Sequence, residues 1–179
     1  ICVDKDIEKI ARLERGELPI FEPGLEDIVQ RNVAAGRLRF TTDARSAVQQ
    51  SLVIFIAVPT PPQEDGSTDL SYVDEVARTI GEHLDGYKVV VTKSTVPVKT
   101  AERVRRGVVE AAQAAGKRSI RCSVASNPEF LREGSAVEVR RQNFQVMRRR
   151  IGKGLQEADR DAVGLLSGRT ARRPDPDPF

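Results

Sequence analysis

This chain has few of the residues that build metal centres, disulfide frameworks and aromatic binding surfaces. Its 179 residues include one histidine, two cysteines, no tryptophan and only 4% aromatic residues. Cys2 and Cys122 lie far apart and lack the paired spacing of a zinc site or a disulfide framework. We therefore predict no metal site and interpret both cysteines as small buried apolar residues. No apolar run reaches the length of about 18 residues that a membrane span needs.

The chain begins at Ile1, and Met147 is its only methionine. We therefore expect it to be part of a longer protein. No leader with a charged, an apolar and a small-residue part is visible, which favours a cytoplasmic location. The lone His83 precedes Leu84-Asp85-Gly86, where a helix should stop, and this position indicates a solvated helix end instead of a catalytic role.

Basic charge is concentrated towards the C-terminus. Residues 1–139 contain 19 Lys and Arg against 21 Asp and Glu, whereas residues 140–179 contain 10 against 5. A basic tail can bind nucleic acid or an anionic surface through non-specific electrostatics. This tail lacks the interleaved aromatic residues that stack on bases, so we expect no specific nucleic-acid binding.

Apolar residues alternate between strand and helix patterns as far as residue 126. The patterns predict strands at 1–3, 38–40, 52–58, 88–92 and 120–125, and helices at 6–15, 25–35, 44–50, 71–84 and 98–115. Asp43 can cap the helix at 44–50, and Ser71 can cap the helix at 71–84. The run at 52–58 is continuously apolar, which predicts burial on both faces of a parallel sheet. This alternation indicates an α/β fold of the doubly wound type.

The periodic pattern ends near residue 138. Residues 139–179 include Arg148-Arg149-Arg150 and end in alternating proline and aspartate, which predicts a weakly structured basic tail. Gly152 and Gly154 match half of a dinucleotide-binding glycine pattern, but no strand precedes them and the third glycine is missing, so we interpret the match as chance. We therefore divide the chain into an α/β domain at 1–138 and a divergent tail at 139–179.

Polar residues follow the predicted strands, at the edge where open α/β sheets bind ligands. Asp4 stands where an acid could accept hydrogen bonds from an adenosine ribose, or it caps the next helix. Thr60 follows the strand at 52–58, where a plain turn is an equally good interpretation. Lys93-Ser94-Thr95 offers two hydroxyls to an anionic or sugar ligand, although Thr95 could instead cap a helix that starts near Pro97.

The densest polar cluster is Asn127-Pro128-Glu129-Phe130-Leu131-Arg132-Glu133-Gly134, which follows the last predicted strand. It combines two carboxylates, a guanidinium and a proline-restricted turn. One interpretation is a solvated helix start with a local ion pair that contributes little. The apolar Phe130 and Leu131 between the charges favour a pocket lining instead.

Taken together, these segments resemble the UDP-glucose/GDP-mannose dehydrogenase family, and most closely the UDP-glucose 6-dehydrogenases. The resemblance extends over residues 1–138, and several long motifs in the same order make it more specific than any single motif. The matching segments are Val3-Asp4, Gly16 through Leu25, Gly36 through Thr42, Phe55 through Val58, Asp65-Gly66-Ser67, Asp69 through Val73, Lys93 through Pro97 and Ser126 through Ala136.

The resemblance implies a Rossmann-type, mainly parallel sheet and NAD as the cofactor. By this likeness Asp4 would hold the adenosine ribose and Lys9 would lie beside the cofactor. Val58, Thr60 and Thr95 would border the dinucleotide.

The resemblance also implies oxidation of UDP-glucose, or of a related nucleotide sugar, to the uronate. Glu129, Phe130 and Leu131 would contact the sugar nucleotide. Glu133 would face the cofactor and share a catalytic water with Thr95, an arrangement suited to general-base chemistry because the water must lose a proton as it attacks. Full-length members of the family are expected to form homo-oligomers.

Some parts that the resemblance implies do not appear in this sequence. A glycine-rich turn and a first strand would precede Ile1, and without that central strand the sheet should have exposed strand edges. The family's catalytic lysine and cysteine would follow well after Glu133, and neither Cys2 nor Cys122 corresponds to that cysteine. We therefore expect the chain alone to be inactive, with a non-catalytic nucleotide-binding remnant or pseudoenzyme as the alternative. The abrupt loss of resemblance after Ala136 leads us to hypothesise a disrupted reading frame.

Overall fold

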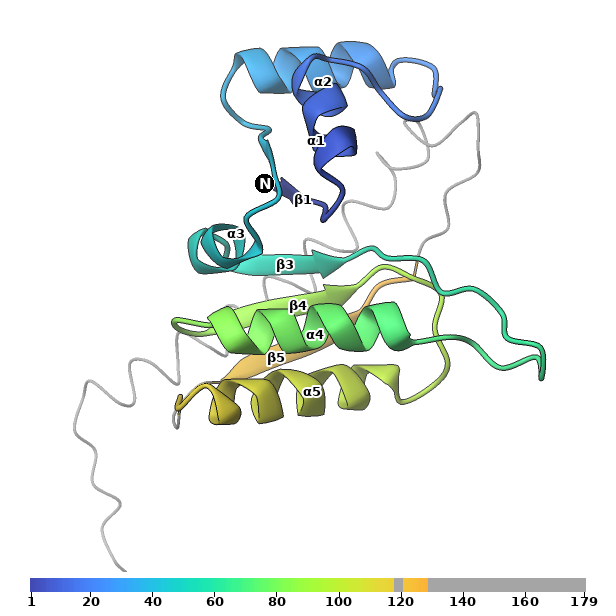
Figure 1. Ribbon diagram of the computed structural model, residues 1–179, viewed down its shortest axis with the longest axis vertical. Helices are drawn as coiled ribbons and strands as arrows, with labels where there is room; N and C mark the ends of the chain where they lie inside the picture. Colours follow the sequence, from blue (N-terminus) through green and yellow to red (C-terminus); the bar gives the residue numbers. More distant parts are fainter. Residues whose placement is uncertain (118–120, 129–179) are drawn as a thin grey trace, which may run out of the picture.

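The computed structural model describes residues 1–117 and 121–128, in which parallel strands alternate with helices (Figure 1). The predicted α/β alternation is confirmed, while the expected tail at 139–179 lies outside the described residues. The elements are β1 (Cys2–Val3), α1 (Ile7–Glu14), α2 (Leu25–Ala34), β2 (Phe40–Thr41), α3 (Ala44–Gln50), β3 (Val53–Ile56), α4 (Ser71–His83), β4 (Lys88–Thr92), α5 (Thr100–Ala114) and β5 (Cys122–Ser126).

The strands form two parallel sheets. β1 pairs with β2, and in the second sheet β4 lies between β3 and β5. The register of this second sheet aligns Ile56 with Thr92, and Thr92 with Ser126. The three strands therefore end together, and the loops that follow them leave from one edge.

β1 and β3 belong to different sheets, so each has one edge that pairs with no other described strand. The carbonyls of Leu52 and Ile56 accept backbone hydrogen bonds from the β4 side, so Val53 and Phe55 direct their backbone groups towards the open edge. The prediction of burial on both faces at 52–58 is wrong for part of this run, since Leu52 is 49% and Phe55 43% exposed. β4 has a neighbour on each side and is buried along its whole length.

The two cysteines differ in burial. Cys2 is exposed on the short strand β1, so its interpretation as a buried apolar residue is wrong. Cys122, at the amino end of β5, is half-buried and packs against the core.

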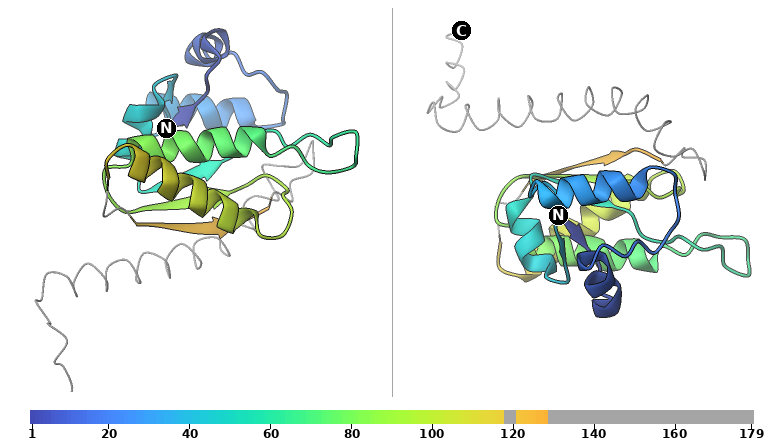
Figure 2. Two further views of the ribbon diagram at one scale, coloured as in Figure 1. Left: turned by 60° about the horizontal axis from the view of Figure 1, so that its bottom comes forward. Right: turned by 90° about the horizontal axis from the view of Figure 1, so that it is seen from above.

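Helices α4 and α5 cover one face of the three-stranded sheet (Figure 1 and Figure 2). The Arg103 guanidinium of α5 donates two hydrogen bonds to the Asp74 carboxylate of α4, at 2.8 and 2.6 Å. Gly81 allows the close approach of the two helices, because a Cβ at this position would collide with the Val108 carbonyl oxygen. The core that α3, α4 and α5 form with the sheet consists of Val48, Ile56, Val73, Ala77, Ile80, Leu84, Val90, Val104, Val108 and Ala112.

One of the two predicted helix caps is confirmed. Asp43 caps α3 as predicted, with its side chain accepting a hydrogen bond from the Ser46 N–H at 3.0 Å. Ser71 does not cap α4; it is the first helical residue, and its N–H donates to the Asp69 carboxylate at 2.8 Å. Within residues 1–117 and 121–128, every helix is too short or too polar to cross a bilayer.

Candidate functional site

The loops after β3, β4 and β5 meet at the carboxyl edge of the sheet. The Lys93 N–H donates to the Ile56 carbonyl at 2.8 Å, and the Asn127 N–H donates to the Thr92 carbonyl at 2.9 Å. Each bond extends the strand pairing by one residue beyond the end of a strand. Ligands in open α/β sheets bind outside this edge, so the structure brings the predicted loop residues to the expected place.

Two side-chain hydroxyls connect the loop after β3 to the loop after β4. Ser94 Oγ donates to the Val58 carbonyl at 2.6 Å in a partly buried position. Thr60 Oγ1 donates to the Thr95 carbonyl at 3.3 Å in an exposed position. These bonds bring together Val58, Thr60 and Thr95, the three residues that were expected to border a dinucleotide.

Thr95 presents an exposed side chain at this edge. It does not cap α5, whose preceding residue Lys99 adopts a φ of 73° and makes no side-chain capping bond. The alternative of Thr95 as a helix cap is therefore wrong, and its hydroxyl can reach a ligand.

Thr92, the last residue of β4, is a feature that the sequence interpretation missed. Its side chain is 1% exposed, and its Oγ1 has no hydrogen-bond partner among the described residues. A buried hydroxyl without a partner costs stability unless it holds a water. The threonine completes an apolar run, so periodicity alone gives no sign of it.

Asp4 follows β1, and its carboxylate is held by two donors. Lys9 Nζ lies 2.5 Å from Oδ2, and the Asp6 N–H donates to Oδ1 at 3.1 Å. The hydrogen bond from Lys9, followed by that from the Asp6 backbone, lowers the pKa of Asp4 below its ordinary value. The cap of α1 is Asp6 and not Asp4, so that alternative for Asp4 is wrong.

The loop that contains Asp4 contacts the start of α4. Lys5 Nζ lies 3.5 Å from a carboxylate oxygen of Glu75 and 5.8 Å from the centre of the Tyr72 ring. Both partners belong to the first turns of α4, which begins after the loop that leaves β3 (Figure 1). Asp4 therefore lies on the same side of the molecule as the loops after β3 and β4.

Four predicted site residues lie outside the described residues: Glu129, Phe130, Leu131 and Glu133. The meeting of Thr95 with Glu133 around one water therefore stays a prediction.

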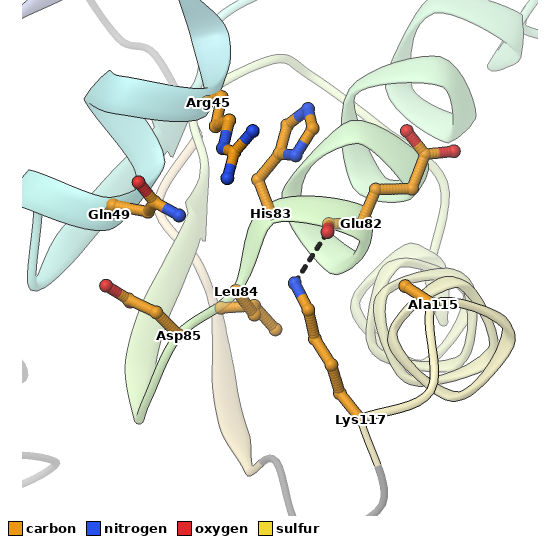
Figure 3. A pocket seen from close by; sticks show the side chains of 8 residues that line it. All are labelled: Arg45, Gln49, Glu82, His83, Leu84, Asp85, Ala115 and Lys117. Atoms are coloured by element: carbon orange, nitrogen blue, oxygen red, sulfur yellow. Dashed lines mark hydrogen bonds between the residues drawn. The ribbon is translucent and has the colours of Figure 1, made fainter.

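A cavity of about 590 Å³ lies at the opposite edge of the sheet, between the ends of α3, α4 and α5 (Figure 3). Lys117 Nζ donates to the Glu82 carbonyl at 2.5 Å, and Asp85 pairs with the buried Lys88 at 2.9 Å. These cations satisfy carbonyls and a carboxylate near a helix C-terminus, which is a structural role. His83 is the last residue of α4, which ends one residue before the predicted bound of 84, so His83 lies at a helix end as predicted. The cavity is lined by Arg45, Gln49, Glu82, His83, Leu84, Asp85, Ala115 and Lys117.

Neither cysteine of the described part resembles an activated nucleophile at the carboxyl edge. Cys122 begins β5 and aligns with Lys88, so it lies at the amino edge of the sheet. Burial raises the pKa of the Cys122 thiol, which keeps it protonated and weakly nucleophilic. Cys2 is exposed on β1.

Comparison with known proteins supplies independent information. Residues 1–159 match the UDP-glucose/GDP-mannose dehydrogenase family, NAD binding domain. The chain is 55% identical over 139 residues to the UDP-glucose 6-dehydrogenase of Rhizobium meliloti, covering 77% of this chain and 31% of that protein. It is 53% identical over 137 residues to the UDP-glucose 6-dehydrogenase TuaD of Bacillus subtilis, covering 76% and 29%.

Two solved structures share the fold. A UDP-glucose dehydrogenase from Pyrobaculum islandicum has a TM-score of 0.69 at 46% identity, over 76% of this chain and 31% of that chain. A GDP-mannose dehydrogenase from Pseudomonas aeruginosa has a TM-score of 0.68 at 38% identity, over 76% and 32%. The chain thus spans less than a third of the length of these relatives, and the family match continues beyond residue 138, where the sequence interpretation placed its boundary.

Proposed function

The chain belongs to the UDP-glucose/GDP-mannose dehydrogenase family, and we propose that it supplies the NAD-binding part of an enzyme that oxidises UDP-glucose to UDP-glucuronate. UDP-glucose is favoured over other nucleotide sugars because relatives at 55%, 53% and 51% identity are UDP-glucose 6-dehydrogenases. The GDP-mannose dehydrogenase structure is less similar, at 38% identity.

The observation that carries the proposal is the convergence of Val58, Thr60 and Thr95 through the hydroxyl bonds of two neighbouring loops. These loops offer backbone groups and an exposed hydroxyl to a dinucleotide at the carboxyl edge. Asp4 suits the ribose end, because its ionised carboxylate follows a strand and can accept hydrogen bonds from ribose hydroxyls. Lys9 would neutralise that carboxylate and lie beside the cofactor. NAD+ would supply the hydride acceptor for the alcohol oxidation.

Within this proposal, Thr95 and Glu133 act on a water and the segment from Glu129 to Leu131 contacts the sugar nucleotide. The Thr95 hydroxyl orients the water and the Glu133 carboxylate accepts its proton, which is the task of a general base. The positions of Cys2 and Cys122 suit neither for covalent catalysis. We therefore expect no NADH formation from this chain alone.

The proposed location is the cytoplasm. The described part has two free cysteines, one of them exposed, and free thiols are typical of reducing compartments. We also propose that the full-length protein forms homo-oligomers, which sedimentation of that protein would test.

Calorimetric titration with NAD+ tests the cofactor role. We expect the chain to bind NAD+ and Asp4→Asn to weaken binding about tenfold or more, since a hydrogen bond to a charged acceptor contributes about 1.5–3 kcal/mol. Asp27→Asn is the matched control, because Asp27 is an aspartate in the first turn of α2 to which we assign no role in the site. Absence of NAD+ binding, or equal losses in both variants, would refute the cofactor assignment.

Titration with UDP-glucose separates the proposal from the alternative of a nucleotide-binding remnant. Our proposal expects both ligands to bind, whereas the remnant would bind NAD+ alone. Formation of NADH from NAD+ and UDP-glucose would show that the expected inactivity of the chain is wrong.

A further inference from the structure

We infer that Ser94 is a positioning residue, whose hydroxyl holds the loop after β4 against the end of β3 and so places Thr95 at the cofactor. The inference rests on the proposed function, because it concerns the same site. The sequence interpretation offered the Ser94 hydroxyl to a ligand together with that of Thr95. The structure separates these neighbours: Ser94 is bonded to the protein, and Thr95 is exposed.

The bond of Ser94 stands where the backbone ladder between β3 and β4 stops. Carbonyls of β3 accept backbone bonds from β4 at alternate positions, with Leu52 bonded to Val89 and Ile56 bonded to Lys93. The next carbonyl in this register is that of Val58. It accepts from the Ser94 hydroxyl at 2.6 Å. A side chain thus replaces a backbone donor, and the connection between the two segments continues past the last rung.

If the backbone pairing continued, the Thr95 N–H would donate to the Val58 carbonyl. That bond would hold Thr95 against the end of β3. Because Ser94 makes the connection, the Thr95 N–H is not needed for it. The Thr95 carbonyl in turn accepts from Thr60 at 3.3 Å. The loops after β3 and β4 can therefore diverge at the edge of the sheet. The hydroxyls of Ser94 and Thr60 set the distance between them.

Ser94 should contribute more than Thr60 to this arrangement. Its bond is shorter and partly buried, whereas the Thr60 bond is longer and exposed. Removing the Ser94 hydroxyl leaves the Val58 carbonyl short of a donor in a partly desolvated place, and such a loss is costlier than an exposed one. Val58 precedes Pro59, which restricts Val58 to extended backbone, so the carbonyl has little freedom to find another partner.

Amide hydrogen exchange of Lys93 tests the holding role without any ligand. Ser94→Ala should raise the exchange rate about tenfold, since one net hydrogen bond of about 1–1.5 kcal/mol is lost from the closed loop. Ser94→Thr keeps the hydroxyl and should restore the rate. Ser123→Ala is the matched control, because it removes a partly buried hydroxyl bond of 2.7 Å to Tyr87, at the start of β4 and β5. After correction for any change in global stability, Ser123→Ala should leave the exchange rate of the Lys93 amide unchanged.

A double-mutant cycle in NAD+ affinity tests whether Ser94 acts through Thr95. Ser94→Ala should weaken binding several-fold in the wild-type background and have almost no further effect in Thr95→Val, because residues that act together are not additive. Additive losses would overturn the inference, as would unchanged Lys93 exchange in Ser94→Ala. If Ser94→Ala does not fold, Ser94→Cys, which keeps the size but donates weakly, gives the same comparison.

The two proposals can fail separately. If wild-type chain binds no NAD+, the proposed cofactor role is wrong, while the exchange of Lys93 still decides whether Ser94 holds the loop. If NAD+ binds but exchange does not respond to Ser94→Ala, only the positioning role is wrong.

Discussion

Gly81 and Gly107 offer a stringent test of the packing between α4 and α5. Both are helical glycines at positions facing the partner helix, yet a methyl group would meet different surroundings. At Gly81 it would collide with the Val108 carbonyl oxygen and lie 2.7 Å from the Ala111 Cβ. At Gly107 it would lie 3.5 Å from the Ala77 Cβ, an ordinary contact distance.

The two Gly→Ala substitutions should therefore change stability in opposite directions. Alanine is favoured over glycine in a helix interior by about 0.5–1 kcal/mol, and we expect Gly107→Ala to gain roughly this amount. Gly81→Ala gains the same propensity but forces the helices apart, and overpacking of a fitted interface costs about 1–3 kcal/mol or more. Because backbone atoms of α5 are among the obstacles, we expect a value at the upper end and a net loss of about 1–2 kcal/mol.

Urea unfolding followed by circular dichroism measures both changes. The midpoint should fall for Gly81→Ala and rise for Gly107→Ala, with unchanged slopes, since neither substitution alters the area exposed on unfolding. A loss of stability in both variants would mean that the interface is tight along its whole length. A gain in both would mean that α4 and α5 do not approach as closely as the structure shows, and the packing argument would be wrong.

Two further predictions concern titratable groups. Because the pKa of Asp4 is lowered in the folded protein, its contribution to stability should be complete above its ordinary value of 3.8 and lost as pH falls through the folded-state pKa. Lys9→Met should flatten this part of the stability profile in acid urea titrations; an unchanged profile would show that the Lys9 contact does not hold in solution. A chromogenic disulfide reagent should modify the exposed Cys2 well before Cys122, whose thiol is half-buried and has a raised pKa, and the reverse order in a mass-spectrometric time course would contradict the described burial.

The sequence predicted the elements well where local signals decide them. Lys88 to Thr92 is a strand with the predicted bounds, and Asp43 caps the helix that it was expected to cap. The errors occur where neighbours decide. Phe55 has an apolar strand sequence but lies beside an open edge, so it stays partly exposed. At the start of α4, Ser71 donates its N–H to the Asp69 carboxylate instead of capping the helix with its hydroxyl. This depends on how the preceding loop turns, which composition does not show.

The location of the site was predictable, but its internal connections were not. Parallel strands end at one edge, so Thr60 and Thr95 had to lie near each other once both strands were recognised. Ser94 and Thr95, however, are adjacent and chemically alike, and no pattern distinguishes the hydroxyl that binds the protein from the one left exposed. That difference depends on the direction of each side chain at the end of β4.

The two ends of the proposed dinucleotide site differ in how firmly the described residues hold them. Thr95 follows β4, which is buried and paired on both sides, and its loop is connected to β3 by Ser94 and Thr60. Asp4 follows a two-residue strand with one paired neighbour, and its loop reaches α4 mainly through the exposed contact of Lys5 with Glu75. Exposed ion pairs contribute little, so the Asp4 loop should open more readily than the Thr95 loop. Binding of a ligand that contacts both would then stabilise chiefly residues 1–43, because they have the most order to gain.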